Sequence, residues 1–183
     1  MKENRICYIM RGASGSGKSY KAEQLKKENE NSEIVSADHY WLDDSGNYNF
    51  DVSKLSLAHK DCFDKFTRLV NSGVNVIVDN TNLKYNDIKK YIDYLVTNNN
   101  LNSYIYSVEL IEVSFNSIED AIKLRSGRTD GKNIPENRMR EMFKAFNQDV
   151  RPNIINDYSG KISLGELDKI EHHNTFNSIC CVF

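Results

Sequence analysis

The chain has 183 residues, which suits one domain large enough to bury a substantial core. Hydrophobic residues make up 39% and charged residues 27% of the sequence, proportions that exclude a disordered or fibrous protein. With a net charge of -2, the protein as a whole lacks the basic footprint of a protein that binds duplex nucleic acid.

The ends of the chain and its cysteines indicate a compartment. Residues 1–10 pair a charged start with a short apolar run, which predicts neither a signal peptide nor a transmembrane segment. The four cysteines, of which Cys7 and Cys62 are internal, have no spacing typical of a zinc site or a disulfide framework. We therefore expect a cytoplasmic protein in a reducing environment.

Short apolar runs alternate with amphipathic segments along the chain. We expect strands near residues 5–10, 33–36, 74–78 and 104–110, and helices near 18–28, 53–70, 85–95, 117–125 and 135–146. Residues 98–100, all asparagine, predict a loop. Strands alternating with helices predict an α/β fold of three layers, with a central parallel sheet of about five strands flanked by helices.

The first turn after a strand carries the strongest motif, Gly12 followed four residues later by Gly17-Lys18-Ser19. In this pattern backbone N–H groups turn inward around phosphates, and the positive end of the next helix adds to the attraction. Lys18 would reach the β and γ phosphates, and Ser19 would ligate Mg²⁺. The pattern predicts a P-loop NTPase that binds ATP or GTP through Gly12, Ala13, Ser14, Gly15, Ser16, Gly17, Lys18, Ser19 and Tyr20.

Asp38 follows the second predicted strand, at the sheet edge where the first strand places the P-loop. A carboxylate at this place suits the base that takes a proton from an acceptor hydroxyl. The alternative is a turn or helix-capping aspartate. Tyr40 and Trp41 would stack on an acceptor base or ribose, or else belong to the core.

A second polar cluster follows the third predicted strand and comprises Asp79, Asn80, Thr81 and Asn82. Asp79 would hold Mg²⁺ through water, and the other three are candidate acceptor contacts. The alternative is a turn in which Asn82 caps the next helix.

Arg125 and Arg128 flank a glycine further along the chain. A loop at this place would bring a guanidinium onto the transferring phosphoryl group. The alternative is a solvated basic loop.

Taken in order, these motifs resemble the bacteriophage-type polynucleotide 5′-kinase family among the zeta-toxin-like P-loop kinases, over about residues 5–150. The resemblance implies ATP-dependent phosphorylation of a 5′-hydroxyl, with Asp38 matching the general base. Arg128 falls within a residue of the family's lid arginine, and Arg125 matches a second basic position. Trp41 stands where the family has an arginine that holds the acceptor, which leaves the acceptor open. The family also has an aspartate directly before its Thr-Asn, whereas this chain has Asn80 there.

Residues 35–38 and the end of the chain also resemble the myelin-type 2′,3′-cyclic nucleotide phosphodiesterase. That chemistry uses two His-x-Thr motifs, and only residues 173–175 have the pattern here. We therefore expect a different reaction.

The last four residues fit a prenylation box, with Cys180 as the thioether site and Cys181 as a palmitoylation site. Lipidation would attach the protein to the cytosolic face of a membrane. The alternative is a chance C-terminus. We expect residues 1–150 to form the kinase-like domain and 151–183 a C-terminal extension.

The sequence thus predicts an ATP-dependent kinase that acts on a polynucleotide 5′-hydroxyl or a nucleoside-like acceptor. Lys18, Asp38, Arg125 and Arg128 are the predicted catalytic residues, and Ser19 and Asp79 the predicted metal ligands. Two alternatives remain, a nucleotide-binding regulatory or scaffold module with little phosphotransfer, and a small-molecule or nucleotide kinase.

Overall fold

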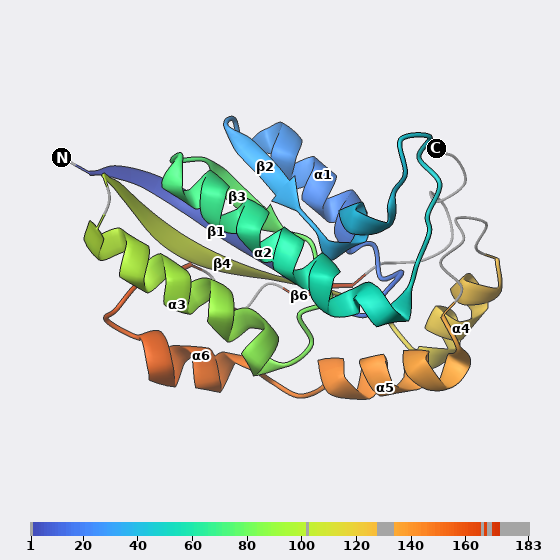
Figure 1. The fold of residues 1–183 in the computed structure, drawn as a ribbon. Helices are drawn as coiled ribbons and strands as arrows, with labels where there is room; N and C mark the ends of the chain where they lie inside the picture. The colour runs from blue at the N-terminus through green and yellow to red at the C-terminus, as the bar shows by residue number, and fades with distance from the viewer. Residues whose placement is uncertain (1, 102, 128–133, 166, 168–169, 173–183) are drawn as a thin grey trace.

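A parallel sheet with helices on both faces forms the centre of the molecule (Figure 1). The structure, a computed structural model, describes residues 2–101, 103–127, 134–165, 167 and 170–172. The strands follow the order β2-β3-β1-β4-β5, and β6 also pairs with β4. Every pairing is parallel, so the predicted α/β sheet of about five strands is confirmed. The strands are β1 (Glu3–Arg11), β2 (Ser32–Val35), β3 (Asn75–Val78), β4 (Tyr104–Ser114), β5 (Ser163–Leu164) and β6 (Ile170–His172).

Helices connect successive strands of the sheet, as the alternating pattern predicted. They are α1 (Lys18–Glu28), α2 (Leu55–Asn71), α3 (Tyr85–Leu101), α4 (Ile118–Ser126), α5 (Glu136–Phe146) and α6 (Arg151–Tyr158), with short 3₁₀ helices η1 (Ala37–Trp41) and η2 (Val52–Lys54). None of the helices in the described part of the chain has the length and apolar character needed to cross a bilayer.

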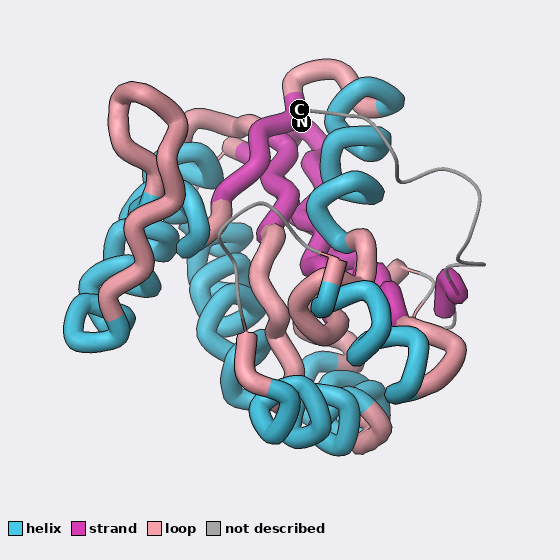
Figure 2. Tube along the Cα trace, turned by 90° about the vertical axis from the view of Figure 1, so that its right-hand side faces the viewer, coloured by secondary structure: helices cyan, strands magenta, loops and turns pink. Residues whose placement is uncertain are grey.

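Alternate residues of the central strands bury into two different helical layers. On β1, Cys7 and Ile9 pack with α2, α3 and α6, whereas Tyr8 and Met10 pack with α1. Burial on both faces requires near-continuous apolar strands, which explains the uninterrupted run on β1. Figure 2 shows the strands between the two helical layers. A third apolar cluster joins α4 and α5 to the P-loop through Ala13 and Phe115.

The loop predicted at residues 98–100 is wrong, because α3 continues to Leu101. Three asparagines inside a helix are disfavoured by propensity, but each amide nitrogen here donates a hydrogen bond. Asn98 Nδ2 donates to Asn71 Oδ1 at 2.8 Å. The Asn99 amide pairs with both the N–H and the C=O of Tyr106 on β4, at 2.7 and 2.9 Å. Tertiary hydrogen bonds therefore outweigh local preference at the end of α3.

Residues beyond 150 take part in the same core. Ile154 and Tyr158 of α6 are buried in the main cluster, and β5 pairs with β4. The boundary at residue 150 stays a prediction. Cys180, Cys181 and residues 173–175 lie outside the described residues, so the lipidation site stays a prediction as well.

Candidate functional site

The P-loop runs between the end of β1 and the start of α1. Gly12 has no room for a side chain, since a Cβ would lie 2.1 Å from the carbonyl oxygen of Val113 on β4. Gly17 adopts a left-handed backbone with φ of 96° directly before α1, a conformation that favours glycine. Two glycines of the motif are thus required by the packing and the turn.

Lys18 and Ser16 are buried in the loop that the motif predicted to hold phosphates. The Lys18 ammonium donates to the carbonyl oxygen of Ala13 at 2.8 Å and is only 7% exposed. The Ser16 hydroxyl is buried, and the structure gives it no hydrogen-bond partner among the described residues. A buried hydroxyl without a partner costs free energy unless a ligand supplies one. A bound phosphate fits this loop, while Ser19 and Tyr20 are exposed on the first turn of α1.

Residues 79–82 tie the P-loop to the neighbouring strand. The Gly12 N–H donates to the carbonyl oxygen of Thr81 at 3.0 Å. Asn82 Nδ2 donates to the Met10 carbonyl oxygen at 2.8 Å. This bond uses the amide nitrogen of Asn82, and α3 begins three residues later, at Tyr85. The Asp87 carboxylate accepts from the Lys84 N–H at the start of this helix.

The same segment holds η1, which carries Asp38. The Ser36 hydroxyl donates to the carbonyl oxygen of Asp79 at 2.8 Å and also accepts from the Asp38 N–H. The Ala37 N–H donates to Asn80 Oδ1 at 2.9 Å. Ser36 is thus the N-cap of η1, and the Asp38 carboxylate is not used for capping. These bonds form a continuous series from the P-loop through residues 79–82 to Asp38.

Asn80 uses both ends of its amide within the protein. Besides the bond to η1, Asn80 Nδ2 donates to the Tyr91 hydroxyl at 3.2 Å and approaches Cys62 Sγ at 3.4 Å. Burial raises the pKa of both Cys62 and Tyr91, which keeps the thiol and the phenol protonated. Asn80 is therefore placed to orient η1, and a direct contact of Asn80 with an acceptor stays a prediction.

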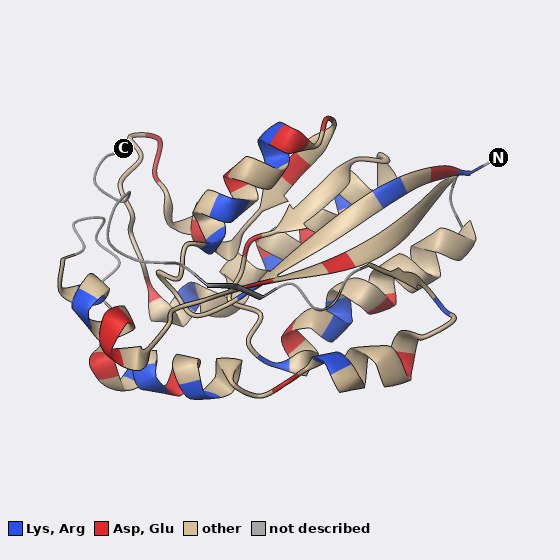
Figure 3. Cartoon of the chain, turned by 180° about the vertical axis from the view of Figure 1, so that it is seen from behind, with Lys and Arg blue, Asp and Glu red and all other residues tan. Residues whose placement is uncertain are grey.

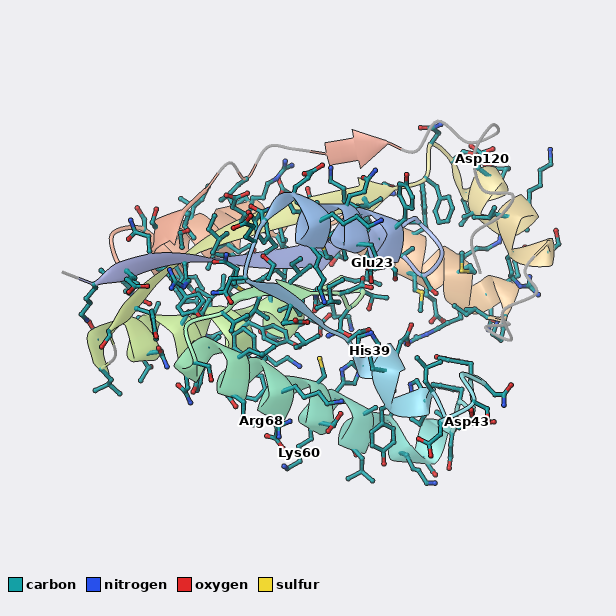
Figure 4. The ribbon with its side chains drawn as sticks, turned by 90° about the horizontal axis from the view of Figure 1, so that it is seen from above. Glu23, His39, Asp43, Lys60, Arg68 and Asp120 are labelled. Atoms are coloured by element: carbon teal, nitrogen blue, oxygen red, sulfur yellow. The ribbon has the colours of Figure 1, made fainter. Side chains whose placement is uncertain are left out.

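Asp38 is partly buried in the first turn of η1. Its Oδ1 accepts a hydrogen bond from the Tyr48 hydroxyl at 3.2 Å. Trp41 is 4% exposed and packs in the core, whereas Tyr40 is 38% exposed. Figure 4 labels His39, the exposed neighbour of Asp38 on η1. Of the two aromatic acceptor candidates, Tyr40 presents the more accessible ring.

The predicted metal ligands offer oxygen atoms, which Mg²⁺ prefers. Ser19 supplies a hydroxyl and Asp79 a carboxylate that is 9% exposed. The described residues contain no group of three or more His, Cys, Asp or Glu side chains able to hold a metal alone. Mg²⁺ in nucleotide sites needs no such cluster, because phosphate oxygens and waters complete its shell. Ser19 and Asp79 therefore fit a magnesium that arrives with the nucleotide.

Arg125 lies beside the P-loop at the end of α4. A small pocket between α4 and the loop is lined by Ser14, Gly15, Phe115 and Arg125, among others. The Arg125 Nε is buried without a hydrogen-bond partner in the described structure. The Ser117 hydroxyl caps α4 by accepting from the Asp120 N–H. Arg128, the other predicted lid arginine, lies outside the described residues.

Sequence comparison with known families matches residues 8–148 to AAA_33, described as an AAA domain. That match spans more than half of the chain. The chain belongs to the AAA_33 family. Human NEDD4-binding protein 2 is 34% identical to it over 88 residues, which are 48% of the chain and 5% of the length of that protein.

Solved structures share the fold of this AAA_33 chain. A chain of the Pnkp1/Rnl/Hen1 RNA repair complex superposes with a TM-score of 0.66 at 19% identity, covering 84% of this chain and 47% of that one. A component of the PezAT toxin-antitoxin system of Streptococcus pneumoniae gives 0.57 at 16% identity, covering 93% and 68%. A gluconokinase from Sinorhizobium meliloti gives 0.52 at 13% identity, covering 92% and 86%. Family and fold together support a nucleotide-binding domain of P-loop kinase type.

One site residue of the AAA_33 chain was not predicted from its sequence. Arg11 directly precedes Gly12 and is 1% exposed. Its guanidinium pairs with buried Glu112 on β4 at 2.5 Å and donates to the carbonyl oxygens of Leu83 and Phe146, each at 3.0 Å. Arg11 thus joins the P-loop to the entry of α3 and the end of α5. The only sign of this role in the sequence is that a charged residue, Arg11, ends an apolar strand.

Proposed function

We propose that the chain transfers the γ-phosphate of ATP or GTP to a hydroxyl group, either the 5′-hydroxyl of a polynucleotide or a hydroxyl of a nucleoside-like molecule. The main support for this proposal is the hydrogen-bonded series from Gly12 through residues 79–82 to η1. It fixes the P-loop and the loop of Asp38 on one edge of the sheet. The resemblance to bacteriophage-type polynucleotide kinases supports the same reaction.

The residues take separate parts in this reaction. The P-loop N–H groups and Lys18 hold the β and γ phosphates. Ser19 and Asp79 would hold Mg²⁺, which when bound neutralises charge on the phosphate oxygens. Asp38 accepts the proton of the acceptor hydroxyl. The hydroxyl oxygen bonds to the γ phosphorus, and the bond between the γ phosphorus and the oxygen that bridges it to the β phosphate breaks. The products are the phosphorylated acceptor and the nucleoside diphosphate.

The lid residues complete the site in this proposal. Arg125, whose Nε has no partner in the described structure, would turn toward the transferring phosphoryl group together with Arg128. Both arginines would stabilise the charge that builds on the equatorial oxygens.

One observation favours a regulatory nucleotide-binding module as the second candidate. Trp41 stands where the resembling kinases hold their acceptor with an arginine, and it is buried in the core. A module of this kind, carried in a longer protein or anchored through Cys180 and Cys181, would bind nucleotide with little transfer.

Transfer of label from γ-labelled ATP distinguishes the two candidates. Purified protein with Mg²⁺ would be incubated with 5′-hydroxyl DNA, 5′-hydroxyl RNA and a panel of nucleosides, beside a Lys18→Ala control. The proposal expects label on at least one acceptor and none with Lys18→Ala. Tight ATP binding with no label on any acceptor would favour the module.

A further inference from the structure

A loop between η1 and α2 forms a groove whose lining begins at Tyr40, two residues after Asp38. Residues 42–54 extend beyond the carboxyl edge of the sheet, at the same end of the molecule as α4 and α5 (Figure 1). This loop and η1 line an open cavity of about 230 Å³. The lining residues used below are Tyr40, Trp41, Leu42, Asp43, Asp51 and Lys54. We call this cavity the loop groove.

The loop groove is held open by hydrogen bonds within the loop. The Asp43 carboxylate accepts from the N–H groups of Ser45 and Asn47 at 3.0 and 2.8 Å. The Asn49 N–H donates to the Trp41 carbonyl oxygen at 2.8 Å, and a β-bridge joins Leu42 to residue 48. A groove with this much internal bonding is formed before any ligand arrives, which lowers the entropic cost of binding.

Apolar side chains are concentrated and exposed around the loop groove. Leu42 is 48%, Phe50 54% and Val52 71% exposed, and Tyr40 adds an accessible ring. Tyr40 and Phe50 each meet the Trp41 ring edge-on at 5.1 Å between centroids. Clustered exposed apolar groups mark binding sites more often than single ones do. An aromatic wall of this kind suits the face of a planar ring.

The rim of the loop groove is acidic. Hydrogen bonds from Asn47 lower the pKa of Asp43, and those from Ser53 lower the pKa of Asp51, so both carboxylates are ionised at neutral pH. The Lys54 ammonium lies 3.7 Å from the Asp51 carboxylate and balances the charge of Asp51, which leaves the charge of Asp43. Figure 3 shows acidic colour at the tip of this loop. A phosphodiester strand entering the groove would face net negative charge.

The loop groove is also coupled to the proposed base. The Tyr48 hydroxyl, on the same loop, donates to Asp38 Oδ1 at 3.2 Å. Asp38 and Tyr40 lie two residues apart on η1. The link between the loop groove and the carboxylate that would accept the proton is therefore Tyr48, which is bridged to the lining residue Leu42 and bonded to Asp38.

We propose that the loop groove binds the ring of an uncharged nucleoside-like acceptor and excludes a polynucleotide strand. The inference rests on the proposed phosphotransfer and names the acceptor class for it. The volume supports one ring system, because pockets for larger drug-sized ligands measure roughly 300–1,000 Å³. The acidic rim supports an acceptor without phosphates.

Trp41 provides the test, because it is the only tryptophan in the sequence and lines the groove. Its fluorescence would be titrated without ATP, using ribonucleosides, nucleoside 3′-monophosphates and a 5′-hydroxyl oligonucleotide as probes. A ribonucleoside should change the emission saturably and bind more tightly than its 3′-monophosphate. Tyr40→Ala should weaken nucleoside binding about tenfold, whereas Tyr40→Phe keeps the ring and the affinity.

Charge variants test the acidic rim separately. Asp51→Asn should strengthen binding of the 3′-monophosphate several-fold and leave the affinity for the nucleoside unchanged. Lys54→Gln should weaken binding of the 3′-monophosphate and also leave the affinity for the nucleoside unchanged. Leu101→Ser, at a residue 77% exposed on the far end of α3, is the matched control and should change neither affinity. Circular dichroism of each variant would show that it folds.

The outcomes separate this inference from the proposed function. Saturable nucleoside binding without label transfer would retain the loop groove and reject the kinase. Label on oligonucleotides with no nucleoside effect on Trp41 would retain the kinase and overturn the inference. Oligonucleotide binding that is tighter than nucleoside binding and weakens with salt would also overturn it, because the groove would then hold a phosphodiester strand.

Discussion

At the scale of single residues, Lys18 is the proposed phosphate-binding side chain whose position is best defined. It is buried, and its ammonium is bonded to the Ala13 carbonyl oxygen. Charge-assisted hydrogen bonds contribute about 1.5–3 kcal/mol, so we predict that Lys18→Ala weakens ATP binding roughly 10- to 150-fold. Titration with a fluorescent ATP analogue would measure this, with Lys27→Ala, an exposed lysine on the same helix, as the control. Equal affinity in the two variants would contradict a phosphate role for Lys18.

Arg11 supports a second prediction at this scale, on stability. Without Arg11, buried Glu112 keeps, among the described residues, only the longer contact to Arg151 at 3.9 Å, and breaking a buried ion pair costs about 3–5 kcal/mol. We therefore predict that Arg11→Met lowers the free energy of unfolding in urea by about that amount. The double variant Arg11→Met, Glu112→Gln should recover part of the loss, because no buried charge is left over. A double variant no more stable than Arg11→Met would show that the ion pair is not the cause.

Single residues also show what the sequence can and cannot predict. The spacing of Gly12, Lys18 and Ser19 was sufficient to predict the loop between β1 and α1, because a P-loop is built from consecutive residues. The loop predicted at Asn98 and Asn99 was wrong, because their hydrogen-bond partners Asn71 and Tyr106 lie on other elements. Propensity describes a residue in its own segment, and here distant hydrogen bonds decided the structure.

At the scale of elements, α3 and α6 are joined by a hydrogen bond whose strength depends on pH. The Tyr85 hydroxyl donates to the Asp157 carboxylate. This bond lowers the pKa of Asp157 below its usual value of about 4. A group with a depressed pKa stabilises the fold above the unfolded-state pKa and loses that contribution as pH falls through the folded-state pKa.

We predict that Tyr85→Phe lowers stability at neutral pH and that the difference from the unsubstituted chain shrinks below about pH 4. Urea unfolding midpoints across an acid series would measure it. Tyr94→Phe, which removes the exposed bond to Asn71, is the control because its acceptor does not titrate in this range. A Tyr85→Phe difference that stays constant with pH would mean that lost packing, and not the Asp157 carboxylate, causes the change.

Elements were easier to predict than the loops between them. Helix and strand positions follow from apolar periodicity, and α1 begins and ends at the residues expected. The loop groove could not be predicted, because it depends on Asp43, Asn49 and Trp41 meeting across a loop. Turn-forming residues indicate a loop but do not indicate the cavity that the loop encloses.

At the scale of the whole molecule, the site exists because parallel strands end at one edge. β2, β3 and β1 are neighbours, and the segments that follow them are hydrogen-bonded in that order. The alternating pattern of strands and helices predicted this edge. The hydrogen bonds that link Ser36, Asn80 and Thr81 could be found only in the structure.

The central claim is that Asp38 accepts the proton of the acceptor hydroxyl. Single-turnover transfer from ATP to the best acceptor, compared between the unsubstituted chain and Asp38→Asn, tests it most directly. A positioned base contributes roughly 10²- to 10⁴-fold, so we predict a loss of that size in the transfer rate with ATP affinity unchanged. Transfer by Asp38→Asn at the unsubstituted rate would contradict it.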